Sequence, residues 1–275
     1  QSKAVQAIDS VPYLSIDQLK QSSTVDSVQG FGLLFAMFNC GSAPFNDVKN
    51  RQAVLYAIDM DKVISTALLG NAAAASSFVP ENNPAYQKAA TVYALDQDKA
   101  KSLLAQTGLT NMRMLCTDHD WVQNVTPIIK ENLEAVGLTV DFAQKKSADV
   151  YTTIDGKPEA YDMVIAPGDP SVFGNDADLL MRWWYANDTW TDLRMHWKGQ
   201  PAYTQLQGLL DQAVQATGSA QTDEWHQAFD LISEQVPLYP LFHRKAPTGY
   251  DAQTLVAFQP ISLTGLSFVD VGSTK

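Results

Sequence analysis

The spacing of apolar positions changes repeatedly along the chain and predicts alternating strands and helices. Short apolar runs predict buried strands at Phe31–Asn39, Met112–Cys116, Leu138–Phe142 and Tyr161–Ala166. Between these strands, apolar residues recur at helical spacing. This spacing predicts a helix at Asp96–Thr107 that ends at Gly108, a helix capped by Thr126 with Pro127 in its first position and Gly137 at its end, and a short helix at Ala148–Ile154.

Two helix starts follow each other within the stretch from Pro44 to Val63. Asn46 or Asp47 can cap a first helix, and Asp59 or Asp61 can cap a second. The first helix would bury Val48, Val54, Leu55 and Ile58, and the second would bury Val63, Ile64, Ala67 and Leu68 before ending at Gly70. The segment "NAAAASSFVPENNPAYQ" that follows predicts a loop, because small residues give way to Pro and Asn.

The two ends of the chain carry weaker patterns. Ser15 and Gln18 fit a capping box, and "TVDSVQG" predicts a short strand followed by a turn. The segment "VPLYPLFHR" predicts a strand broken by Pro237 and Pro240, and the tail to Lys275 predicts loops and edge strands. Two helical stripes lie before that strand: Leu206, Leu209, Leu210, Ala213 and Val214, then Trp225, Phe229, Ile232 and Val236.

The order of these elements predicts the fold class. Strand, helix, strand, helix and strand follow one another through the middle of the chain. Such alternation is typical of an α/β fold with a mostly parallel sheet, flanked by helices and joined by right-handed crossovers.

Composition and charge exclude some classes of function. The 275 residues carry a net charge of −11, with 45% apolar and 18% charged residues. A strongly acidic chain without a basic tract is not expected to bind nucleic acid. No apolar run approaches the ~20 residues of a membrane-spanning helix. The start, "QSKAVQAIDS", opens within what reads as a structured segment, so we expect the chain to be part of a longer one.

Metal, thiol and nucleophile chemistry find little support in the sequence. His119, His196, His226 and His243 are scattered without zinc-ligand spacing, and the oxygen-rich "TDHD" at 117–120 fits a helix cap better than a metal site. Cys40 and Cys116 can form either a disulfide or two separate buried thiols. Neither a nucleophile elbow nor a phosphate loop occurs, so no enzyme is predicted. A hydrolase or transferase would need a nucleophile and a base near Gly168.

One loop stands out as a candidate ligand site. It follows the predicted strand Tyr161–Ala166 at its carboxyl end, where ligands bind in open α/β sheets. Asp176 also fits a plain helix cap, and Trp183 and Trp184 fit the core. Asp169 has no such local explanation. The candidate residues are Gly168, Asp169, Ser171, Phe173, Asn175 and Asp176.

The stretch "PFNDVKNRQAVLYAIDMDKVI" resembles a signature of extracellular solute-binding proteins of peptide ABC importers, the dipeptide and oligopeptide class of family 5. The residues that match that pattern in order are Pro44, Phe45, Asp47, Arg51, Ala53, Ala57, Ile58 and Asp59. Asn39 before the signature, the helix at Asp96–Gly108, the segment Leu133–Val140, "YDM" at 161–163 and "QVPLYPLFH" also resemble the family.

The resemblance implies one lobe of a type II periplasmic-binding-protein fold. Residues 31–245 would form the second lobe, residues 1–30 the end and crossover of the first, and residues 246–275 a tail that returns to it. Most of the first lobe would be absent from this chain. A peptide would be trapped between the lobes outside the cytoplasmic membrane and passed to permease subunits.

For the ligand, the resemblance implies pairing of a peptide amino terminus with an acidic residue after the "YDM" strand. Asp169 is the candidate by position. This loop departs from the common pattern, which has Asp slightly later, and Asp176 is therefore the alternative. The same scaffold is known for nickel chelates, oligosaccharides and glutathione, so these ligands stay open, and no cofactor is expected. We also expect a lipid anchor in the full-length protein and weak or no binding by one lobe alone.

Overall fold

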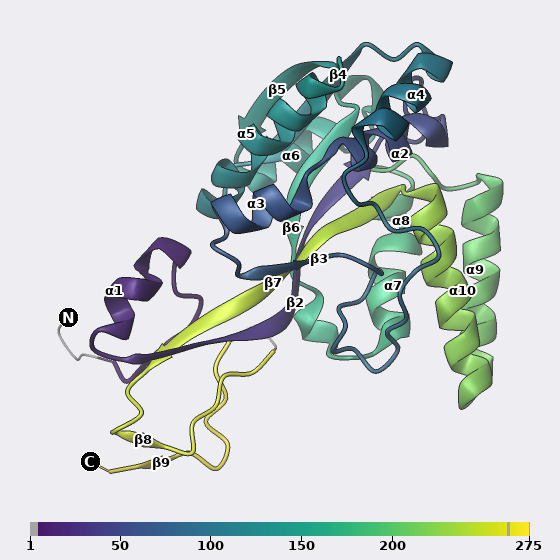
Figure 1. The fold of residues 1–275 in the computed structure, drawn as a ribbon. Helices are drawn as coiled ribbons and strands as arrows, with labels where there is room; N and C mark the ends of the chain where they lie inside the picture. The colour runs from purple at the N-terminus through teal and green to yellow at the C-terminus, as the bar shows by residue number, and fades with distance from the viewer. Residues whose placement is uncertain (1–4, 263–264, 275) are drawn as a thin grey trace.

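The computed structural model describes residues 5–262 and 265–274, except for the side chains of Ser171, Val172 and Ala246. The described part is an α/β fold in which helices cover both faces of one large sheet (Figure 1). The sheet order is β1-β7-β2-β6-β4-β5, with β3 paired to β7. Its strands are β1 (Ala7–Ile8), β2 (Thr24–Phe38), β3 (Ala72–Ala74), β4 (Asn111–Thr117), β5 (Thr139–Lys145), β6 (Met163–Gly168) and β7 (Leu238–Tyr250).

Strand direction divides the sheet into two halves. β4 pairs in parallel with β5 and β6, which confirms the alternation predicted for the middle of the chain. β2 pairs antiparallel with both β6 and β7, so the sheet is mixed and is parallel only in one half. Apolar periodicity reports burial but not direction, and β2 and β7 are not joined to their neighbours by single crossover helices.

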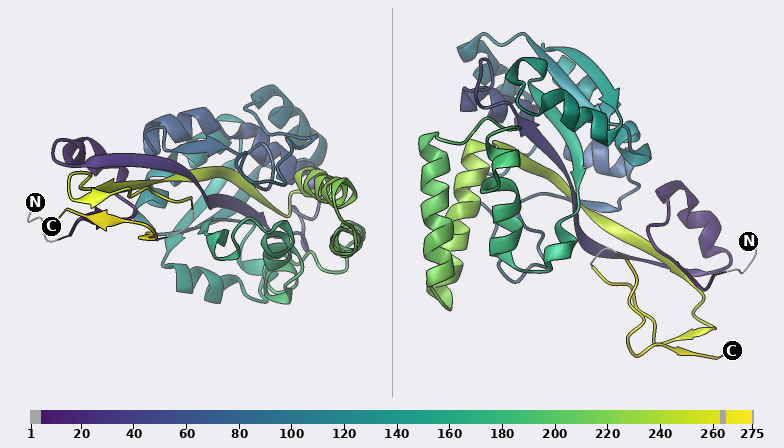
Figure 2. Two further views of the ribbon diagram at one scale, coloured as in Figure 1. Left: turned by 90° about the horizontal axis from the view of Figure 1, so that it is seen from below. Right: turned by 180° about the vertical axis from the view of Figure 1, so that it is seen from behind.

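The helices take the positions that right-handed crossovers require. α5 joins β4 to β5 and α6 joins β5 to β6, so the two lie on opposite faces of the sheet. α9 and α10 form a pair at one end of the molecule (Figure 2). The helices are α1 (Ile16–Lys20), α2 (Val48–Ala57), α3 (Met60–Ala67), α4 (Gln97–Thr107), α5 (Asp120–Ala135), α6 (Ser147–Ile154), α7 (Ala177–Tyr185), α8 (Asp188–Thr191), α9 (Pro201–Gln215) and α10 (Ser219–Gln235), with 3₁₀ turns η1 (Tyr13–Ser15), η2 (Pro158–Ala160) and η3 (Pro170–Phe173).

The two helix starts between Pro44 and Val63 are confirmed. The Asp47 carboxylate accepts a hydrogen bond from the Lys49 amide at 2.8 Å and begins α2. The backbone is extended at Ile58, and the Asp59 carboxylate then accepts from the Lys62 amide at 2.9 Å and begins α3. Of the alternatives, Asp47 and Asp59 are therefore the caps.

Two predicted strand breaks are wrong, because β2 and β7 run through them. β2 has 15 residues, and the expected turn after "TVDSVQG" is a register shift between Gln29 and Leu33 that contains Gly30 and Gly32. Glycine lets a strand bulge without ending. Pro240 likewise lies inside β7, beside a second register shift. The length of the two strands is therefore set by their long-range pairing with each other and not by local strand-breaking residues such as Gly and Pro.

Three other local predictions also need correction. α5 begins at Asp120 and not after Thr126, so Pro127 lies inside the helix; the first turn is closed by amides of Val122 and Gln123 that donate to the His119 carbonyl. The Ser15 side chain makes no cap hydrogen bond, so the capping box is absent. Part of the predicted loop after Gly70 is the edge strand β3.

The two cysteines are separate buried thiols, the second of the two alternatives. Burial raises the pKa of Cys40 to about 11 and that of Cys116 above its ordinary range. Both thiols are therefore protonated at neutral pH, which makes them poor nucleophiles.

β2 and β7 extend away from the helix-covered body of the molecule as a long two-stranded ribbon (Figure 1). α1 and the small sheet formed by β8 (Leu255–Val256) and β9 (Gly272–Ser273) lie at the far end of this ribbon, near both chain ends (Figures 1 and 2). The body and the end segments are thus connected mainly by one ribbon.

We expect His243 on β7 to make stability depend on pH. Burial lowers the pKa of this imidazole to about 4 from an ordinary 6.5. Between these values the unfolded chain binds a proton that the folded chain does not, so the free energy of unfolding falls as pH decreases from 7 to 4, by up to about 3 kcal/mol from this group. Denaturant titrations at pH 7, 5.5 and 4 should show a shallower pH dependence for His243→Gln. An unchanged dependence in that variant would contradict the assignment.

Candidate functional site

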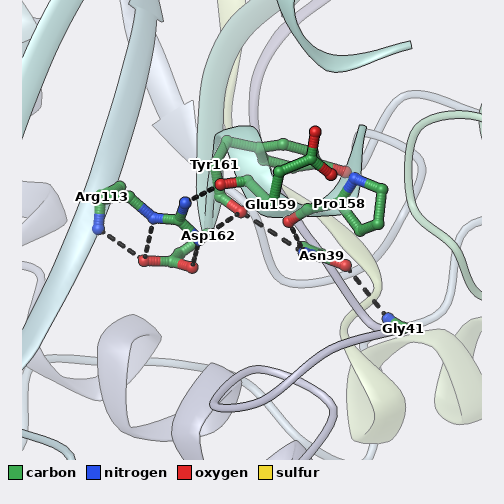
Figure 3. A network of polar contacts seen from close by, with 7 residues as sticks. All are labelled: Asn39, Gly41, Arg113, Pro158, Glu159, Tyr161 and Asp162. Carbon is green, nitrogen blue, oxygen red and sulfur yellow. Dashed lines mark hydrogen bonds and ion pairs between the residues drawn. The ribbon is translucent and has the colours of Figure 1, made fainter. Parts of the chain in front are cut away.

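An ion pair between the buried Asp162 and the partly exposed Arg113 fixes the start of β6. The Asp162 carboxylate, 7% exposed, accepts from the Arg113 side chain at 2.6 Å and 3.2 Å and from the Arg113 amide at 2.7 Å (Figure 3). The same guanidinium donates to the backbone carbonyls of Glu159 and Tyr161. Asp162, the residue directly before β6, is thus held against β4 by several contacts.

Asn39, directly after β2, joins the same network. Its side-chain amide donates to the Pro158 carbonyl at 2.6 Å, and its oxygen accepts from the Gly41 amide at 3.2 Å (Figure 3). Its backbone amide donates to the Asp162 carbonyl at 3.0 Å. The end of β2 and the start of β6 are therefore locked together, and the register between them places Leu33 opposite Gly168 at the other end.

A pocket of about 330 Å³ opens at the carboxyl end of β6. Four different parts of the fold contribute to it: β2, the end of β6 with the following turn, α6, and the α7–α8 region. The lining residues, which define what we call the aromatic pocket, are Phe35, Tyr151, Pro167, Gly168, Asp169, Phe173, Trp183, Trp184 and Trp190.

Edge-to-face and tilted ring contacts hold the walls of the aromatic pocket. The Phe35 ring lies 6.5 Å from that of Trp184 and 5.9 Å from that of Trp190, and the two Trp rings are 6.0 Å apart. Such pairs add to the stability that burial alone provides. The Phe35 backbone is opposite Ala166 in the β2–β6 register, so the sheet itself positions this ring.

Arg194 stacks on two rings of the pocket lining, those of Tyr151 and Trp190. Its guanidinium carbon lies 4.0 Å from the Tyr151 centroid and 4.4 Å from the Trp190 centroid, and its Nε donates to Asp155 at 2.9 Å. Burial raises the pKa of the Tyr151 phenol, so this side chain is neutral at physiological pH. A charge stacked on the aromatic faces and paired to a carboxylate restricts the rotamers of both rings.

Three of the six candidate residues come together in the pocket, namely Gly168, Asp169 and Phe173. Asp169 is an exposed residue of its wall, directly after β6. Asp176 does not line the pocket: its carboxylate accepts from the Leu179 amide at 3.0 Å, which confirms the helix-cap interpretation. Asn175 does not line it either. The side chain of Ser171 lies outside the described part of the chain.

The sequence predicted three of the nine residues that line the aromatic pocket and missed the other six. Phe35 lies on β2, Tyr151 on α6 and Trp190 on α8, all outside the candidate loop, and the packing of these elements brings them to it. Trp184 is buried as expected, but Trp183 is 43% exposed and forms part of the rim. The one available signal was the density of aromatic residues from Phe173 to Trp197, which is high for an element that only fills a core.

Close packing on Gly168 makes this residue sensitive to substitution. A Cβ there would lie 2.8 Å from Cζ2 and 3.3 Å from Cη2 of Trp184. We expect Gly168→Ala to displace the indole into the pocket and to destabilise the fold by roughly 1–3 kcal/mol. Tryptophan fluorescence and thermal unfolding test this, with Gly32→Ala as the control, since a Cβ at Gly32 meets nothing closer than 4.0 Å. Equal effects of the two substitutions would contradict it.

The lining of the aromatic pocket combines apolar surface with one acidic group. Its walls are apolar and aromatic, and Asp169 supplies a carboxylate at the rim. Within the described ranges, no three His, Cys, Asp or Glu side chains gather as a metal-ligand set. Among the same residues, no helix combines the length and hydropathy needed to cross a bilayer. A pocket of this kind fits a ligand with an apolar group and a cationic group.

Comparison with known proteins identifies a family and several relatives that this chain resembles. Residues 1–203 match the family of bacterial extracellular solute-binding proteins, family 5 Middle. The heme-binding protein A of Haemophilus influenzae is 24% identical over 89% of this chain and 48% of its own length. The glutathione-binding protein GsiB of Escherichia coli K12 is 23% identical over 94% of this chain and 52% of its own length. The chain therefore spans about half the length of these relatives.

A solved structure shows the same fold. The dipeptide-binding protein from Pseudoalteromonas sp. SM9913, in complex with Met-Leu, superposes with a TM-score of 0.78 at 19% identity and covers 99% of this chain and 54% of that one. At this level of identity the likeness concerns the fold, which is that of the type II periplasmic binding proteins.

Proposed function

Because the chain belongs to the bacterial extracellular solute-binding proteins of family 5, we propose that it is part of the solute-capturing component of an ABC importer. The solute is a peptide, held between this lobe and a companion lobe outside the membrane and then delivered to the permease subunits. Family members work outside the cytoplasm, and a lipid anchor on the intact protein is part of this proposal.

The observation that carries the proposal is the aromatic pocket at the carboxyl end of β6. Asp169 on its wall pairs with the ammonium group of a peptide amino terminus, and the aromatic walls receive an adjacent apolar side chain. The peptide backbone pairs with exposed main-chain groups near the end of β6, as in strand addition.

The ribbon of β2 and β7 supports a two-lobe organisation. It leaves the body that contains the pocket and carries α1, β8 and β9 at its far end. In this proposal residues 31–245 form the second lobe, while residues 1–30 and 246–275 belong with the first. Hinge motion along the ribbon would close the lobes around the peptide. A chain that covers about half of its relatives agrees with this division.

The family and fold are those of transport proteins that bind solutes and are not enzymes. The protonated thiols of Cys40 and Cys116 agree with a role without covalent chemistry. We therefore propose binding and release as the whole activity of this chain within its importer.

A thermal-shift screen of the intact protein tests the ligand class. The panel contains di- to pentapeptides, glutathione, heme, oligosaccharides and nickel chelates, because relatives are named for heme and glutathione binding. We expect the largest increase in melting temperature with peptides that have a free amino terminus. A shift only with heme, a sugar or a metal chelate would assign the pocket to that ligand and overturn the peptide proposal.

A further inference from the structure

A second pocket lies beside the ribbon and shares no residue with the aromatic pocket. It has a volume of about 470 Å³ and lies between β3, the ribbon strands β2 and β7, and the segment 76–82. We call it the ribbon pocket, and it is lined by Gln29, Ala73, Ala74, Ser76, Val79, Pro80, Glu81, Asn82, His243 and Lys245.

Two opposite charges line the ribbon pocket without pairing. Lys245 on β7 is half-buried, and Glu81 on the segment 76–82 is exposed. Among the described residues neither forms an ion pair with another side chain. An ammonium group and a carboxylate around one cavity complement a ligand that carries both charges.

The amide side chains of the ribbon pocket are already oriented. Gln29 donates its Nε2 to the carbonyls of Gly30 and Arg244, at 3.1 Å and 3.2 Å. Asn82 donates its Nδ2 to the Gln29 carbonyl at 3.0 Å. Within the described chain no donor reaches the oxygen of either amide, so both are available acceptors for a ligand ammonium group, as is the Glu81 carboxylate.

His243 adds a buried polar group to this wall. The residue is only 3% exposed, and its ring nitrogens make no well-aligned hydrogen bond among the described residues, although the Ser77 backbone lies close enough to influence the pKa of the ring. A buried polar group without a partner costs free energy, which a polar ligand beside it can lower. Ala73, Ala74 and Val79 supply the apolar remainder of the wall.

We propose that the ribbon pocket binds a small zwitterion of the α-amino acid type, independently of the aromatic pocket. The ammonium group of the ligand contacts Glu81 and the amide oxygens of Gln29 and Asn82, and its carboxylate contacts Lys245. The volume of the cavity accommodates a free amino acid. Because the pocket includes residues of both ribbon strands, its occupation stiffens the connection between the body and the end segments.

Calorimetric titration of the intact protein with the twenty free L-amino acids tests the proposal. For the tightest of them, the N-acetyl and the carboxamide analogues are measured as well. We expect each analogue, which lacks one charge, to bind roughly tenfold more weakly or worse. Two results would overturn the proposal: no binding of any amino acid at about 10 mM, or an analogue that binds as tightly as the amino acid itself. The first result counts against the proposal even if its cause is another part of the protein that covers the pocket.

Charge-matched variants then locate the site. Lys245→Met should weaken the amino acid but not its carboxamide, and Glu81→Gln should weaken the amino acid but not its N-acetyl form. Lys101→Met, on the exposed face of α4, is the control and should change nothing. Trp183→Ala in the aromatic pocket should leave amino-acid binding unchanged. Loss of binding in Trp183→Ala but not in Lys245→Met would assign the amino acid to the aromatic pocket and refute the second site.

Discussion

Asp169→Ala in the intact protein is expected to weaken binding of a peptide with a free amino terminus by roughly 100-fold or more. Asp169 lies on the wall of the aromatic pocket directly after β6 and is exposed in this chain. Closure of a second lobe over it would remove both the carboxylate and the ligand ammonium group from water. Truncating one partner of such a pair costs 2–5 kcal/mol, much of it from the charge left unpaired.

Removing the charge from the ligand tests the same pair from the other side. Calorimetry compares a peptide with its N-acetylated form on the native protein and on Asp169→Ala. The native protein should lose affinity on acetylation, whereas the variant should bind the two forms nearly equally. Asp98→Asn, on the exposed start of α4, is the control and should behave as the native protein does. An undiminished preference of Asp169→Ala for the free amino terminus would remove Asp169 from the site.

Helix starts were the part of the fold most accessible from sequence. Asp47, Asp59, Asp96 and Asp176 each accept a hydrogen bond from an amide two or three residues later and begin the helices α2, α3, α4 and α7. These contacts are local, so the sequence around each residue contains the needed information. α1 and α5 are exceptions: the Ser15 side chain makes no cap hydrogen bond, and the first turn of α5 is closed by the backbone carbonyl of His119.

Strand lengths and the sheet order were not accessible in the same way. β2 and β7 continue through Gly30 and Pro240 because each offers the other a long row of backbone partners, more than 200 residues away in sequence. The aromatic pocket shows the same limit. Gly168, Asp169 and Phe173 lie close together in sequence and were predicted as one loop. Strand pairing brings Phe35 to that loop, and the packing of α6 and α8 brings Tyr151 and Trp190.

The signature at Pro44–Asp59, which indicated the family, has a structural meaning in this chain. Asp47 and Asp59 are helix caps, and the Phe45 ring is fully buried and stacks on Phe38 at 5.4 Å. None of these residues lines the aromatic pocket. The signature therefore identifies the fold but contains no residue of the candidate ligand site. For this reason the family was easier to predict from the sequence than the site.

Arg51, also in that signature, gives the largest expected effect on stability. The residue is 1% exposed, and its guanidinium donates to the Phe45 carbonyl at 2.6 Å and to the Gln235 carbonyl at 2.9 Å and 2.7 Å. Gln235 is the last residue of α10, so the positive charge lies at the negative end of that helix dipole. Arg51 thereby ties the start of α2 to the end of α10.

Arg51→Met should lower the free energy of unfolding by roughly 3–5 kcal/mol, because the buried Phe45 carbonyl and the partly buried Gln235 carbonyl lose their charged donor while the apolar stem is retained. Urea unfolding followed by circular dichroism measures the loss. Arg182→Met is the matched control: Arg182 pairs with Asp178 and Asp211 on a partly exposed face, so its loss should cost less than about 1 kcal/mol. Arg51→Lys should fall between the two, since it keeps the charge but not the fork of donors. If Arg51→Met lowered the free energy of unfolding no more than Arg182→Met does, the contact of Arg51 with α10 would not stabilise the fold.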